Sequence, residues 1–166
     1  SEDEALMFAK TSGIVLMSQT DNLTPADKKL YALRDVTGTV ENIPLISGSI
    51  MSKKIAAGAD AIVLDVKCGS GAFMKDYSSA VSLAETMVDI GRSVGREVTA
   101  VISGMDQPLG MNIGNSLEVI EAIEILKGNA GGDLLEVALT LGAYMLISSK
   151  TVKTVDEGKA ILLEKI

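Results

Sequence analysis

The run Ala-Ile-Val-Leu-Asp-Val at residues 61–66 constrains the fold of this chain more than any other segment. We interpret it as a strand of a parallel sheet that is buried on both faces, because such strands are almost continuously apolar. A long helical pattern begins at Asp76 or Ser78 and stops near Gly95, and a second strand is expected at residues 98–102. The order strand, helix, strand implies a right-handed crossover. The expected fold class is therefore α/β, with a largely parallel sheet flanked by helices.

Further elements are expected on both sides of this unit. The apolar run at residues 14–17 reads as a short buried strand. Thr24 before Pro25 is typical of a helix start with threonine as the cap, and Gly58 is typical of a helix end. Helices are expected from Pro25 onward, from residue 43 to Gly58, from a capping box at residues 115–118 to Gly128, at residues 133–148, and from residue 154 to the end.

The composition restricts both the core and the partners of the chain. Hydrophobic residues make up 47% of the 166 residues and aromatic residues only 3%, so the core must be aliphatic. No apolar run approaches the ~20 residues that span a bilayer, and the acidic opening lacks the basic start of a signal peptide. We therefore expect no membrane partner and a cytoplasmic location. The net charge of −7 argues against nucleic-acid binding, which needs clustered Lys and Arg.

The absence of histidine limits the chemistry that this chain can perform. With no His and the single cysteine Cys68, a structural zinc site and a Ser-His-Asp triad are excluded within the chain, and so is an internal disulfide. Cys68 is expected to be a small packing residue. Any chemistry must then use Lys, Arg, carboxylates, hydroxyls and backbone groups.

The segment at residues 31–74 carries the polar residues with the clearest chemical meaning. Ser49 and Lys53 are four residues apart, so on a helix they lie on one face, and Arg34 precedes them. A guanidinium, a hydroxyl and an ammonium together can hold a planar group rich in carbonyls. Two of these residues also have an ordinary interpretation: Lys53 as a solvated surface residue, and Arg34 as the partner of Asp35 or Glu41.

This segment closely resembles the pyrimidine-nucleoside and thymidine phosphorylases, which cleave a nucleoside with phosphate. The resemblance implies that Arg34, Ser49 and Lys53 hold the carbonyl oxygens and the ring N–H of the pyrimidine base. It also implies that the base pocket is walled by four largely apolar side chains, those of Tyr31, Ile46, Ile50 and Phe73. Apolar residues at helical spacing are more often simple core, so that interpretation of the four stays open.

Two loops invite ligand-binding interpretations. The run Lys-Cys-Gly-Ser-Gly at residues 67–71 follows a strand but has neither of the common phosphate-loop spacings. In the phosphorylases the phosphate is held by residues earlier in the sequence, so no phosphate-binding residue is expected in this chain. The second loop resembles a potassium site of bacterial members, made by the backbone carbonyls of Leu109 and Asn112 and the carboxylate of Glu121. The alternative for Glu121 is a solvated helix residue.

The resemblance also sets expectations for the organisation of the chain. It starts without Met and stops within a helical pattern, so we expect a piece of a longer protein. Residues 1–24 and 58–166 would belong to a large α/β domain, and residues 25–57 to a small all-α domain that makes a homodimer contact. Without the rest of that domain, we expect residues 25–57 to be displaced, with their polar side chains out of register with Phe73, and the chain alone to be inactive.

The expected reaction is a pentosyl transfer from a pyrimidine nucleoside to phosphate, with no organic cofactor. One alternative is an enzyme like the anthranilate phosphoribosyltransferases, which share the overall fold but do not need the set Arg34, Ser49 and Lys53. Another is a scaffold or assembly module without catalysis. Preference for uridine or thymidine is not decided by this sequence.

Overall fold

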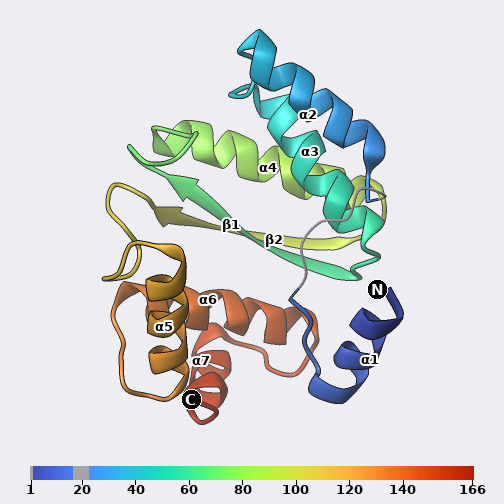
Figure 1. Ribbon diagram of the computed structural model, residues 1–166. Helices are drawn as coiled ribbons and strands as arrows, with labels where there is room; N and C mark the ends of the chain where they lie inside the picture. Colours follow the sequence, from blue (N-terminus) through green and yellow to red (C-terminus); the bar gives the residue numbers. More distant parts are fainter. Residues whose placement is uncertain (1, 17–22) are drawn as a thin grey trace.

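The computed structural model describes residues 2–16 and 23–166, and Figure 1 shows their arrangement. In chain order the elements are α1 (Glu2–Ser12), α2 (Pro25–Thr37), α3 (Ile43–Ala56), β1 (Ala61–Cys68), α4 (Tyr77–Ser93), β2 (Glu97–Gly104), α5 (Asn115–Leu126), α6 (Asp133–Ser148) and α7 (Val155–Leu163). Helix α1 was not expected from the sequence, and α7 ends before the end of the chain.

The two strands form a parallel sheet, which confirms the α/β class. Their register runs from Ala61 opposite Glu97 to Cys68 opposite Gly104, and α4 makes the connection between them. In the part of the chain that the structure describes, the sheet has two strands. The carboxyl ends of both strands therefore lie at one edge, which is where parallel sheets usually carry their sites.

Helices cover the sheet on both sides (Figure 1). Helix α4 packs on both strands and α3 packs on α4, while α6 approaches the opposite face with α7 behind it. The main hydrophobic core lies on the α4 side and includes residues of β1, α4 and α3. Ile46 and Met51 of α3 belong to this core, so α3 is anchored to the α/β layer through its buried face.

The expectation that residues 61–66 are buried on both faces is wrong. Ile62, Leu64 and Val66 are buried, but Asp65 is exposed and Val63 is half-buried. Burial alternates along β1 because different helices pack on its two faces: α4 packs closely on one face, whereas α6 covers the other only in part. This leaves a polar side chain at the carboxyl end of β1 on the less covered face.

The strand expected at residues 14–17 is also wrong where the structure describes it. Residues 14–16 have no regular structure, and Ile14 and Leu16 are 66% and 93% exposed, while residue 17 lies outside the described residues. Among the described residues no strand pairs with this segment. A short apolar run without a partner strand has no way to satisfy its backbone as sheet.

The caps explain where several helices begin. Asp76 caps α4 by accepting a hydrogen bond from the Ser79 amide, and Thr154 forms a capping box with Glu157 at α7. Thr24 precedes α2 as expected, but its side chain makes no capping hydrogen bond. At α5 the cap is Gly114, one residue earlier than expected.

No helix among the described residues combines the length and apolar character that a membrane span requires.

Candidate functional site

Helix α2 places Tyr31 and Arg34 toward α3. Gly38 ends α2 in a left-handed conformation, with φ of +66°, and the chain turns back beside the helix. Arg34 is only 5% exposed, and its guanidinium donates to the carbonyls of Thr39, at 3.4 Å, and Leu45, at 3.1 Å, and to a third carbonyl, that of Val40. These bonds fix the plane of the guanidinium.

The alternative reading of Arg34 as a salt-bridge partner is therefore wrong, because its contacts are backbone carbonyls rather than Asp35 or Glu41. A guanidinium has five N–H donors, and these three bonds leave it further hydrogens for a ligand. Its carbon lies 5.1 Å from the centre of the Tyr31 ring, so the cation also packs on an aromatic face.

Helix α3 supplies the hydroxyl and the ammonium. Ser49 is 6% exposed, and one turn later the Lys53 ammonium donates to its hydroxyl at 2.8 Å and to its carbonyl at 3.1 Å. Lys53 also forms an ion pair of 2.6 Å with Asp27 of α2. With 30% of its side chain exposed, Lys53 is held in a defined place, so the interpretation as an ordinary solvated lysine does not describe it.

The predicted base-site residues line one cavity of about 310 Å³. Its lining includes all seven of them: Tyr31, Arg34, Ile46, Ser49, Ile50, Lys53 and Phe73. This volume is at the lower end of the range for small-molecule sites, and the wall is largely apolar with a few converging polar groups. Such a cavity suits a small planar heterocycle.

The expectation that the polar side chains of residues 25–57 would be out of register with Phe73 is wrong. Phe73, which follows β1, lines the same cavity as Arg34 and Lys53. The physical reason is the core anchoring of α3, whose Ile46 and Met51 pack with β1 and α4. That shared core keeps the polar face of α3 in register with the end of the sheet.

The backbone amides of the loop at residues 69–72 all donate hydrogen bonds to other groups of the protein. The amides of Gly69, Gly71 and Ala72 donate to the carbonyls of Met74, Met105 and Gly69, respectively. The Ser70 amide donates to the Asp106 carboxylate at 2.8 Å. A phosphate loop needs amides that point toward the anion, and these point elsewhere. These contacts fix residues 69–72 as a tight turn within the protein.

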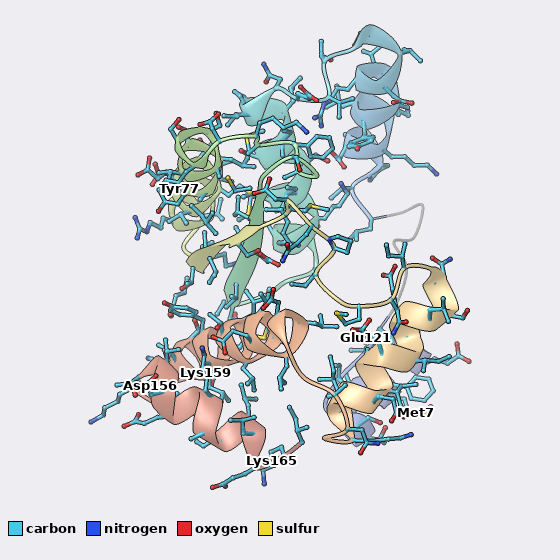
Figure 2. All side chains as sticks on the ribbon, turned by 90° about the vertical axis from the view of Figure 1, so that its left-hand side faces the viewer. Met7, Tyr77, Glu121, Asp156, Lys159 and Lys165 are labelled. Atoms are coloured by element: carbon cyan, nitrogen blue, oxygen red, sulfur yellow. The ribbon has the colours of Figure 1, made fainter. Side chains whose placement is uncertain are left out.

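Glu121 of α5 lies beside the loop that follows β2 (Figure 2). It is 7% exposed, and its carboxylate accepts hydrogen bonds from the amides of Met111, at 2.7 Å, and Asn112, at 2.9 Å. These bonds hold the pKa of Glu121 below its ordinary value. The solvated alternative for Glu121 is wrong.

The surroundings of Glu121 suit a hard cation in part. A buried carboxylate and backbone oxygens are the donors that such an ion prefers, and each carboxylate oxygen keeps a lone pair beyond its amide bond. The loop packs closely, because a Cβ added to Gly110 would lie 2.6 Å from a Glu121 oxygen. Potassium binding by Leu109, Asn112 and Glu121 stays a prediction.

Three polar side chains at the site, those of Asp27, Asp65 and Lys67, were missed by the sequence analysis. Asp27 lies one helical turn before Tyr31, a spacing that could have shown it to share the face of Tyr31 and Arg34. At the carboxyl ends of the strands, Lys67 pairs with Asp65 at 2.7 Å and donates to Ser103 at 2.8 Å. Asp65 and Lys67 both belong to β1 and line the same cavity. Their contacts with Ser103 of β2 depend on the sheet register, which the sequence does not state.

Comparison with known proteins identifies the class. Residues 1–166 match the glycosyl transferase family, α/β domain, and the chain belongs to that family. It is 59% identical over 164 residues to the pyrimidine-nucleoside phosphorylase of Bacillus subtilis strain 168, and 61% identical over 166 residues to that of Staphylococcus aureus strain USA300. Each match covers 99% of this chain and 38% of the relative, so the chain spans well under half the length of these relatives. The similarity expected from residues 31–74 is thus confirmed.

Proposed function

We propose that this chain is the base-binding part of a pyrimidine-nucleoside phosphorylase. The reaction converts a pyrimidine nucleoside and phosphate to the free base and a pentose 1-phosphate. The single observation that carries this proposal is the cavity in which Arg34, Ser49 and Lys53 meet four largely apolar side chains. The high identity to two bacterial phosphorylases supports it.

The chemistry explains why cations are needed at the base. The bond between the pentose C1′ and the ring nitrogen breaks, its electron pair goes to the base, and a phosphate oxygen forms a new bond to C1′. The negative charge spreads over the ring nitrogen and the carbonyl oxygens of the leaving base. Arg34 and Lys53 are fixed before the reaction, so they stabilise this charge more in the transition state than in the ground state.

Other parts of the reaction belong to residues outside this chain. We expect the phosphate site in the remainder of the full-length protein, because the glycine loop beside the cavity has no amides to offer an anion. Residues 25–57 would contribute to a helical domain. Closure of that domain onto the α/β domain would bring the base site and the phosphate site together. We further expect a cytoplasmic homodimer, and a potassium ion held by Leu109, Asn112 and Glu121 that would tie α5 to the loop after β2.

The test is phosphorolysis by the full-length protein. Uridine and thymidine are supplied separately with phosphate, and release of the free base is followed by absorbance, with phosphate omitted as the control. We expect phosphate-dependent release from at least one of the two nucleosides. If uracil binds but neither nucleoside reacts, the proposal is wrong and the protein is the scaffold without catalysis. If anthranilate and a phosphorylated ribose react instead, the other transferase is correct.

A further inference from the structure

Asp27 lies at the base site but has no part in the reaction described so far. It sits in the first turn of α2, and only 11% of its side chain is exposed. Its carboxylate meets the Lys53 ammonium at 2.6 Å. A carboxylate that is this strongly buried needs a partner of opposite charge, and here that partner is Lys53, which lines the cavity.

The geometry around the Lys53 ammonium shows what Asp27 does. The Lys53 ammonium makes three contacts: a 2.6 Å ion pair with the Asp27 carboxylate, and hydrogen bonds to the Ser49 hydroxyl at 2.8 Å and the Ser49 carbonyl at 3.1 Å. A base carbonyl entering the cavity can replace the longest of these bonds. The other two would then keep the ammonium in place while it holds the ligand.

Lys53 needs this restraint more than Arg34 does. A lysine head group ends a flexible four-carbon chain, whereas the Arg34 guanidinium is planar and is held by three backbone carbonyls. Without an anchor, Lys53 would lose the fixed position on which transition-state stabilisation depends.

The charge of Asp27 also matches the reaction. Burial acts to raise the pKa of Asp27, but hydrogen bonds from Lys53 and Ser49 and the charges of Lys53 and Arg34 outweigh it, so the pKa lies below its ordinary value. Asp27 is thus ionised at neutral pH. Two cations and one carboxylate give the cluster a net charge of +1, which complements a leaving base that carries one negative charge.

We propose that Asp27 is a positioning residue of the base site, acting through Lys53 and Ser49 to hold the ammonium where the base carbonyl and the developing charge will lie. This inference rests on the proposed function and adds a residue to its site. Asp27 itself touches neither the base nor the reacting atoms.

The experiment is a double-mutant cycle in the full-length protein. Asp27→Asn should lower kcat/KM by about tenfold or more, chiefly through kcat, because the anchor acts on the transition state. Asp35→Asn, an exposed carboxylate on the same helix, is the matched control and should leave kcat/KM unchanged. Adding Asp27→Asn to Lys53→Met should change kcat/KM by less than about twofold, because the residue through which Asp27 acts is already gone.

Two results would overturn the inference. One is a kcat/KM of Asp27→Asn within twofold of the wild type, and the other is a double variant whose loss in kcat/KM equals the product of the losses of the two single variants. A merely structural role of Asp27 gives the second result. If Asp27→Asn does not fold by thermal melting, Asp27→Glu replaces it in the same cycle, since it keeps the charge and displaces the contact. Phosphorolysis by the wild type is measured first. An inactive wild type contradicts the proposed function, whereas an active wild type with multiplying losses contradicts only the role of Asp27.

Discussion

At the scale of single residues, the two cations of the cavity are held by different means. Arg34 depends on backbone carbonyls of the turn after α2 and of Leu45 in the first turn of α3. Lys53 depends on two side chains, those of Asp27 and Ser49. Helical spacing predicted that Ser49 and Lys53 lie on one face, and the resemblance to the phosphorylases implied that Arg34 joins them. The partners of Arg34 could not be predicted, because backbone carbonyls carry no residue-type signal.

The first prediction concerns these cations. Lys53→Met and Arg34→Ala should each lower kcat/KM of the full-length protein by on the order of 10²-fold, the loss typical of a donor that acts on the transition state. Lys54→Met is the matched control, since Lys54 is the neighbouring lysine and does not line the cavity. Steady-state phosphorolysis of uridine and thymidine measures all three. Near-normal turnover of either site variant would remove that residue from the site.

At the scale of elements, the cap of α4 connects sequence, structure and pH. The hydroxyl of Ser78 and then the amide of Ser79 donate to Asp76 and lower its pKa from 3.8 to about 2. A carboxylate whose pKa is lowered by folding stabilises the fold above its unfolded pKa, and this contribution is lost as the pH falls through the folded pKa.

Asp76→Ala should therefore lower the melting temperature of this chain at pH 7. The difference from the wild type should shrink as the pH falls from about 4 to about 2, because the wild-type cap becomes protonated there. Asp89→Ala is the control on the same helix, since Asp89 is 78% exposed and its ion pair with Arg92 spans 4.0 Å. Thermal melts across this pH range make the comparison. A difference that stays constant down to pH 2 would contradict the role of the cap.

The next prediction concerns the potassium site proposed between α5 and the loop after β2. Replacing potassium with a large organic cation should lower the melting temperature of the full-length protein, because an ion that binds only the native state stabilises it. Glu121→Gln should abolish this response, whereas Glu124→Gln, whose side chain pairs with Lys127, should keep it. If Glu121→Gln responds as the wild type does, Glu121 is not a ligand.

The elements that the sequence predicted well are those with local signals. Capping residues and terminal glycines placed α3, α4 and α5 to within a few residues, and the amphipathic pattern did the same for α6 and α7. The failures at residues 14–17 and on one face of β1 have a common cause. Apolar runs show that a segment can be buried, but burial depends on which element lies against it, and that is decided elsewhere in the chain.

At the scale of the whole molecule, the chain holds a hydrophobic core and the proposed base site. The core of β1, α3 and α4 is continuous, so we expect the 166-residue chain to fold and to melt cooperatively. We also expect it to be inactive with uridine and thymidine, because phosphate must be aligned with C1′ for the reaction to proceed. The assay uses chain free of host phosphorylase. Turnover within tenfold of the full-length protein would place the phosphate site inside this chain.

The most direct test of the account is a crystal structure of the full-length protein with uracil. We expect the base in the cavity of about 310 Å³, with its carbonyl oxygens within hydrogen-bonding distance of Arg34 and Lys53 and its ring against Phe73. The Lys53 ammonium should keep its contacts with Asp27 and the Ser49 hydroxyl and give up the Ser49 carbonyl. Uracil bound at another place, or an empty cavity at saturating uracil, would contradict the central claim that these residues form the base site.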